Sequence, residues 1–410
     1  MTASAERAHS GRRGPGWFTA LIVYTLIVHA AYNGLRVLIS YRTLELGGGA
    51  GVLGLVTATY SLAPLLAAIP IGRWVDRGYA MPVMWIGTVL TILPAAGAAW
   101  SPGVAVLLAA NMALGMGQVL TTVSGQALIP QSFAQSDLNR RFGTLTVGVS
   151  AGQAVGVPVA GLIAGTGGAD AHVQPAMWAM AGIAALAVPA MVGITRRPAV
   201  RHVPRAEARS SVRSPLAILG TRGMKPAIFA SMATLAAVDI MTAYLPLIGQ
   251  RYGLGVQAVA ALLTLRTLAS IVSRLSIGRL TRLVPFTRLL ALASLTGGIA
   301  LLLIPVQPRF WVLAILMVAA GFAFGLTQPM TMTWVSTLAD PANRAAVLSI
   351  RLAGNRLSQV VIPAAAAGVA AFGPTGAVFL LSGALLLTAA GSTALRGAPP
   401  TGSSPRERLD

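Results

Sequence analysis

The chain has no cysteine among its 410 residues, and its single lysine is Lys225. The missing cysteines exclude disulfides, thiolate metal sites and a cysteine nucleophile. Because Pro226 follows the lysine, a G-x-x-x-x-G-K-[ST] loop for nucleotide phosphates is excluded too. The four histidines are too scattered along the chain for a metal site. We therefore expect no metal, no cofactor and no enzymatic activity.

Charged side chains make up 10% of the chain and hydrophobic ones 55%, and the mean hydropathy is +0.74. Soluble domains carry about 25% charged residues, so this chain lacks the polar surface of a soluble fold. Read at roughly 20 residues per crossing, its apolar stretches predict an all-α membrane protein with twelve transmembrane helices. The predicted spans are residues 17–39, 50–71, 82–100, 103–128, 142–165, 175–194, 225–249, 254–277, 287–306, 308–337, 344–370 and 374–395.

Positive charge dominates, with a net charge of +20. With these twelve spans, most arginines fall on one side of the membrane, and the loops of the opposite side hold only Arg42, Arg251 and Arg309. Basic loops stay in the cytoplasm, which places both termini there and the protein in the cytoplasmic membrane. The charge then reflects topology in the lipid bilayer, and we expect no nucleic-acid partner.

The spans divide into two groups of six. Residues 1–194 hold the first group and residues 225–396 the second, and the basic, proline-broken segment 195–224 joins them. We expect this segment to be a cytoplasmic linker, and residues 397–410 to be a disordered cytoplasmic tail.

Matching landmarks recur in the two halves. Gly72 ends the second span as Gly278 ends the eighth, and Gly115 lies in the fourth span as Gly321 lies in the tenth; the two pairs have the same separation in sequence. Such a repeat indicates duplication and predicts two pseudo-symmetric six-helix halves. Parallel six-span repeats with a binding site near the midplane occur in one large transporter architecture.

The loop after the second span reads GRWVDRG from Gly72 to Gly78. It resembles the G-x-x-x-D-R-x-G-R-[RK] loop of the major facilitator superfamily, although the final glycine and basic pair are missing here. The resemblance implies that Gly72 permits a close helix approach, and that Asp76 and Arg77 latch the cytoplasmic gate. The second copy keeps Gly278, but Arg282 stands where an aspartate would be expected.

Membership of this superfamily would imply a gradient-driven transporter that moves a small molecule by alternating access. The resemblance also implies a functional monomer and allows H⁺ as the coupling ion. Spans one, four, seven and ten would line the central cavity. Two other classes remain open: a membrane enzyme acting on lipids, and a receptor or scaffold with a transporter fold.

The fifth span carries small residues at helical spacing: Gly148, Gly152, Gly156, Pro158 and Gly161. Glycines four apart share a helix face and allow tight packing. The pattern also resembles a motif of proton-coupled drug exporters in the superfamily. However, Asn111 in the fourth span occupies the place of an arginine that those exporters carry, so a multidrug or metabolite exporter remains the alternative.

Charged residues inside a span are costly and normally face a bundle interior. Asp239 is the only acid within a predicted span, and it lies near the centre of its span, as Arg266 and Arg356 do in theirs. Arg36 lies toward the outer end of the first span, and Arg351 lies nearer the cytoplasm in the eleventh. Asp239 and Arg266 lie at similar depth on consecutive spans, so we expect them to pair. Asp239 is also the candidate for proton coupling.

The remaining arginines suit an anionic solute, because a guanidinium binds carboxylate or phosphate with two parallel hydrogen bonds. We expect Arg36 and Arg356 to contact it, and Arg266 to be a weaker candidate. His29 and Asn33 share a helix face with Arg36. The other polar residues expected to line the cavity are Asn111, Gln118 and Gln328.

Overall fold

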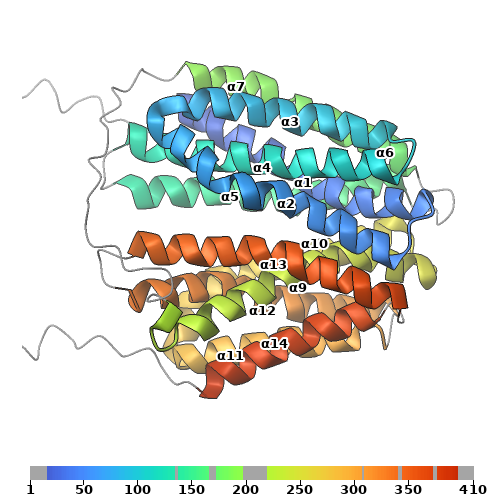
Figure 1. The fold of residues 1–410 in the computed structure, drawn as a ribbon, viewed down its shortest axis with the longest axis vertical. Helices are drawn as coiled ribbons and strands as arrows, with labels where there is room; N and C mark the ends of the chain where they lie inside the picture. The colour runs from blue at the N-terminus through green and yellow to red at the C-terminus, as the bar shows by residue number, and fades with distance from the viewer. Residues whose placement is uncertain are drawn as a thin grey trace, which may run out of the picture.

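The computed structural model describes residues 16–133, 137–165, 172–196, 219–306, 309–339, 344–372 and 376–395. Every regular element in these ranges is a helix. Most of the expected linker 195–224 and the whole tail 397–410 lie outside the described residues. The helices run side by side in two groups (Figure 1).

The first group contains α1 (Gly16–Glu45), α2 (Ala50–Trp74), the short π-helix η1 (Val75–Tyr79), α3 (Ala80–Trp100), α4 (Val104–Ser132), α5 (Leu138–Ala164), α6 (Val173–Ala185) and α7 (Ala187–Thr195). The second contains α9 (Met224–Arg251), α10 (Val256–Leu283), α11 (Phe286–Leu303), α12 (Phe310–Thr337), α13 (Arg344–Phe372) and α14 (Ala377–Leu395).

Eleven helices in the described ranges are long and apolar enough to cross a membrane, where the sequence predicts twelve. In this count α6 and α7 form one span, which is interrupted at Leu186. The helix left out is α13, which has 29 residues and is long enough. Arg351, Arg356 and Gln359 lower its hydropathy, but they lie on a helix that packs between α2 and α9. The all-α fold with two halves is confirmed.

Glycines allow α5 to lie directly on α1. A methyl group at Gly152 or Gly156 would collide with the carbonyl oxygen of Leu26 or Ala30, and one at Gly148 would lie 3.1 Å from the carbonyl oxygen of Ile22. Backbone contact of this kind tolerates no larger side chain. Helix association in lipid relies on such packing, because burial from lipid brings no hydrophobic gain.

The same close approach occurs at equivalent places in the two halves. A methyl group at Gly115 of α4 would collide with the carbonyl oxygen of Tyr60 on α2. One at Gly321 of α12 would collide with the carbonyl oxygen of Arg266 on α10. Tyr60 and Arg266 have the same separation in sequence as the two glycines, so the repeat is present in the packing as well.

The two ends of the bundle differ. We call the end where α1 begins and α14 ends the terminal face, and the opposite end the far face (Figure 1). Near the far face, the Tyr244 hydroxyl donates to the carbonyl oxygen of Ala50 at 2.9 Å, and Gly54 lies against Pro363 and Ala367. Helices α2 and α13 pack together there, so the far face joins the two halves.

The loop between α2 and α3 lies at the terminal face. The expected close approach at Gly72 and Gly278 is wrong for this structure, because a methyl group at either would meet nothing within 4 Å. The contacts between the halves described above lie near the other end. Gly78 has a φ of 96°, which favours glycine and lets the chain turn into α3. Arg77 is exposed, and the side chain of Asp76 lies outside the described part of the structure.

The contact between α5 and α1 can be tested with two glycines of the same helix. Gly156→Ala should destabilise the protein by about 1–3 kcal/mol, because the added methyl group meets the backbone of α1. Gly143→Ala is the matched control, since nothing lies within 4 Å of its added carbon, and alanine is the better helix former. Thermal unfolding of the purified protein in detergent measures both. Equal melting temperatures would contradict the packing described.

Candidate functional site

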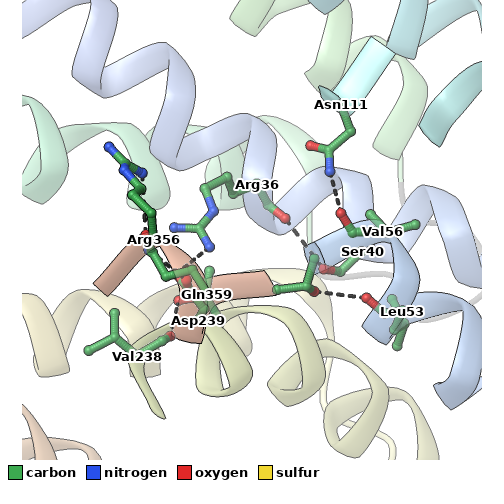
Figure 2. A network of polar contacts seen from close by, with 11 residues as sticks. Arg36, Ser40, Leu53, Val56, Asn111, Val238, Asp239, Arg356 and Gln359 are labelled. Atoms are coloured by element: carbon green, nitrogen blue, oxygen red, sulfur yellow. Dashed lines mark hydrogen bonds and ion pairs between the residues drawn. The ribbon is translucent and has the colours of Figure 1, made fainter. Parts of the chain in front are cut away.

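An ion pair joins the two halves in the middle of the bundle. Arg36 of α1 donates from its Nη2 to Oδ1 of Asp239 on α9 at 2.5 Å. Gln359 of α13 donates from Nε2 to the other carboxylate oxygen at 2.8 Å. Both oxygens of Asp239 are therefore engaged, and its side chain is only 3% exposed (Figure 2). Two donors to one buried carboxylate offset much of the cost of burying it.

The expected pair between Asp239 and Arg266 is wrong. The partner of Asp239 is Arg36, because α1 packs directly against α9. Arg266 is close enough for its guanidinium to be influenced by the charges of Arg36 and Asp239. Its Nε is buried and has no hydrogen-bond partner in the described part of the chain. The hydropathy pattern does not show which helices face each other.

Arg356 lies beside this ion pair. Its Nη1 donates to Oε1 of Gln359 at 3.3 Å, and its guanidinium points away from Asp239 (Figure 2). The guanidinium of Arg36 also stands 5.0 Å from the centre of the Tyr60 ring, a cation–π distance. We call Arg36, Asp239, Arg266, Arg356 and Gln359 the central cluster. It holds three arginines and one carboxylate.

Sequence reasoning missed Gln359 and Tyr60. Gln359 lies three residues after Arg356 and so on a neighbouring position of the same helix face. Tyr60 stands at the repeat position of Arg266. The helix spacing from Arg356 could have identified Gln359, and the repeat offset from Arg266 could have identified Tyr60.

A small cavity lies on the far-face side of the ion pair. We call it the far cavity. Arg36, Tyr60 and Asn111 line it, together with Thr242 of α9. The Asn111 amide donates to the carbonyl oxygen of Val56 at 2.6 Å and so ties α4 to α2 (Figure 2). The arginine that drug exporters carry at this place is replaced here by a helix-to-helix hydrogen bond.

A second, small cavity lies on the terminal-face side between α1, α4 and α5. We call it the α1–α4–α5 cavity. His29 lines it, and its Nδ1 bonds to the carbonyl oxygen of Thr25 at 2.9 Å. Asn33 lines neither cavity, and its amide donates to the carbonyl oxygen of His29 at 2.8 Å. Gln118 is half-buried on α4, between the stretches of that helix that line the two cavities.

Gln328 belongs to a separate network in the second half. Arg351 donates from Nη2 to Oε1 of Gln328 at 2.8 Å, and the Gln328 amide donates to the carbonyl oxygen of Ser231 at 3.0 Å. The Ser231 hydroxyl bonds Oδ1 of Asn355 at 2.9 Å. These bonds tie α9, α12 and α13 together. Gln328 is thus hydrogen-bonded to other protein groups. It lines neither of the two cavities, although the sequence suggested that it would line the central one.

Gly148, Gly152 and Gly156 of α5 lie against α1, whereas Gly161 does not. A methyl group at Gly161 would collide with the side chain of Ala260 on α10, in the other half. Pro158 lies within α5 between these two contacts. No group of three metal-ligating side chains gathers in the residues that the structure describes.

The family model of the Major Facilitator Superfamily matches the chain over residues 21–308 and again over residues 256–409. The chain belongs to the major facilitator superfamily. It is therefore a membrane transporter by family, which agrees with its apolar helices and its two halves. No curated protein matches the chain.

Solved structures of superfamily transporters share the fold. A mutant of the nucleoside transporter NupG has a TM-score of 0.78 and 14% identity, covering 93% of this chain and 100% of its own. A D-xylose–proton symporter has a TM-score of 0.76 and 14% identity, covering 95% and 100%. A bacterial homolog of the human lysosomal transporter Spinster, inward-facing and unoccupied, has a TM-score of 0.69 and 16% identity, covering 95% and 100%.

The ion pair between the halves should show energetic coupling. Arg36→Gln and Asp239→Asn should each destabilise the protein by about 3 kcal/mol or more, because each leaves an uncompensated buried charge. The double variant should lose at least about 1 kcal/mol less than the sum. Thermal unfolding of the wild type, the two single variants and the double variant gives the coupling energy of this double-mutant cycle.

Glu45→Gln is the control for this cycle. It removes the exposed pair of Glu45 with Arg42, 3.0 Å long, and should cost less than about 1 kcal/mol. Coupling of Asp239 to Arg266 in place of Arg36 would contradict the arrangement seen in the structure.

Proposed function

We propose that this protein is a secondary active transporter of a small organic anion, which it moves across the cytoplasmic membrane by alternating access. The central cluster is the proposed binding site. The site is built from a single chain, and we propose that the monomer is the functional unit.

The observation that carries the proposal is the surplus of guanidinium groups around the one carboxylate. Arg36 is engaged with Asp239, whereas Arg356 donates to the amide oxygen of Gln359 and forms no ion pair within the described residues. The buried Nε of Arg266 has no hydrogen-bond partner there. An uncompensated arginine at the middle of a bilayer costs at least about 2.5 kcal/mol on insertion scales. An organic anion between the halves would compensate this charge and would gain forked hydrogen bonds.

The position of the ion pair supports alternating access. Arg36 and Asp239 belong to different halves, so their bond holds the halves together at mid-depth, while the contacts near the far face hold them at that end. An anion that binds Arg36 competes with Asp239 and weakens this tie. A ligand can shift a conformational equilibrium only through such a difference in contacts.

Coupling to protons would use the same competition. Once an anion occupies Arg36, the carboxylate of Asp239 loses its charged partner, and a proton would take the place of that partner in neutralising it. Asp239 is the only acid deep within a span in the described part of the chain. The exporter alternative gains no support, because the glycines of α5 are accounted for by packing on α1 and α10.

The orientation follows from charge. We propose that the terminal face is cytoplasmic, because the arginine-rich segment 195–224 connects the halves at that end. A reporter fused after Asp410 reads out this orientation.

Anion selectivity should depend on Arg356. Arg356→Lys keeps the charge but loses the forked donor pair, so the affinity for organic anions should fall several-fold. Arg356→Gln should lower it by about 10- to 100-fold, the range for a charge-assisted hydrogen bond. Titrations of purified protein with a panel of organic anions, cations and neutral compounds measure this. Arg279→Gln, which removes an exposed charge from α10, should leave the affinities unchanged. A preference for lipophilic cations that ignores Arg356 would refute the proposal.

Proton coupling should depend on Asp239. In proteoliposomes, Asp239→Asn should still exchange substrate down its gradient, but its transport should no longer respond to a pH gradient, because an amide carries no titratable proton. Asp137→Asn at the exposed start of α5 is the matched control and should keep the response. An unchanged pH response in Asp239→Asn would assign coupling to another group.

A further inference from the structure

The α1–α4–α5 cavity lies outside the central cluster and is built by the first half alone. Its walls are apolar at Val28, Leu145 and Val149, and polar at His29, Thr122 and Gln126. No charged residue lines it in the part of the chain that the structure describes. A charged group bound there would lack a counter-ion, so the cavity suits an uncharged group.

The ring of His29 gives this cavity a defined hydrogen-bonding character. A carbonyl oxygen can only accept, so the bond to Thr25 requires that Nδ1 of His29 carry the proton. In the neutral ring Nε2 is then an acceptor. Nε2 has no hydrogen-bond partner among the described residues, although the side chain is only 7% exposed. The cavity therefore offers a hydrogen-bond acceptor to any ligand that can donate.

Polar residues on α1 and α4 lie between the lining positions of this cavity and those of the far cavity, and we call them the polar stripe. On α1 it runs from His29 through Asn33 to Arg36. Asn33 and Arg36 follow His29 by four and seven residues, so all three lie on the same face of the helix. On the antiparallel helix α4 it runs from Thr122 through Gln118 to Asn111, again on one face. Both helices contribute to the α1–α4–α5 cavity at one end of the stripe and to the far cavity at the other.

The length of the stripe sets the size of a ligand that could use both ends. His29 and Arg36 are seven residues apart, which is about 10 Å along the helix axis. A molecule with an anionic group at Arg36 would reach His29 only if a second polar group lay at about that distance from the charge.

We infer that the α1–α4–α5 cavity is a second subsite for the transported solute, which binds an uncharged, hydrogen-bond-donating group such as a hydroxyl, about 10 Å from the anionic group held by the central cluster. This rests on the proposed transport of an anion. It narrows the substrate to elongated organic anions with a polar, uncharged far end. The subsite belongs to one half, so it keeps its shape while the two halves move relative to each other.

Two probes that differ by one oxygen atom test the subsite. 8-Hydroxyoctanoate places its hydroxyl about 10 Å from the carboxylate, and octanoate lacks that hydroxyl. Purified wild-type protein should bind 8-hydroxyoctanoate about 5-fold more tightly, the value of one net hydrogen bond. In His29→Phe the two probes should bind equally, because the acceptor is lost. In His29→Gln the preference should return, because the amide oxygen reaches the position of Nε2.

The absence of cysteine allows a second measurement that needs no His29 variant. A single cysteine in place of Thr122 should react with a water-soluble thiol reagent, and 8-hydroxyoctanoate should slow this reaction more than octanoate does. Thr337→Cys, at the exposed last residue of α12, is the control and should react without protection.

The outcomes separate the subsite from the proposed function. Equal affinity of the wild type for both probes, or a preference that survives in His29→Phe, would overturn the subsite and leave anion transport standing. Binding of neither probe, with affinity for cations only, would overturn the anion proposal and the subsite with it.

Discussion

A buried carboxylate that receives donors from both halves is the interaction on which the centre of this molecule depends. Asp239 lies on the second half, Arg36 reaches it from the first, and Gln359 completes its hydrogen bonding. Removing charges from water is expensive, and only close, well-directed partners offset the cost. The arginines that remain without a carboxylate give the surroundings a positive character. The tie between the halves and the proposed binding of an anionic solute thus depend on the same few atoms.

The scaffold around the cluster is held differently. In lipid, apolar side chains gain little by leaving their surroundings for each other, so helix contacts rely on close fit and on hydrogen bonds. The repeat supplies both. Gly115 and Gly321 bring α4 and α12 onto the backbones of α2 and α10, and the duplicated frame then presents Tyr60 in one half and Arg266 in the other. Duplication kept the backbone arrangement, while the side chains at equivalent positions diverged in charge.

Most of the fold could be predicted from the sequence, because the physics that decides it is local. The bilayer requires long apolar helices, and eleven of the twelve predicted spans satisfy that requirement by composition alone. The exception, α13, carries polar residues that serve the interior. The partner of Asp239 could not be predicted, because hydropathy reports depth along a helix but not which helix faces which. Gln328 shows the same limit: its network with Arg351 depends on neighbours from two other helices.

The small residues of α5 have a mechanical consequence. Over Gly148, Gly152 and Gly156 the helix has no side-chain layer between itself and α1, so the two helices turn as one rigid body. Only a few residues further, Gly161 rests on Ala260 of the opposite half. That contact can act as a fulcrum, because two small groups can roll over each other with little change in packing. From Gly161 to Arg141 the helix is about 30 Å long. A rotation of about 10° at this fulcrum would therefore swing the opposite end of the rod by about 5 Å, the width of one side chain.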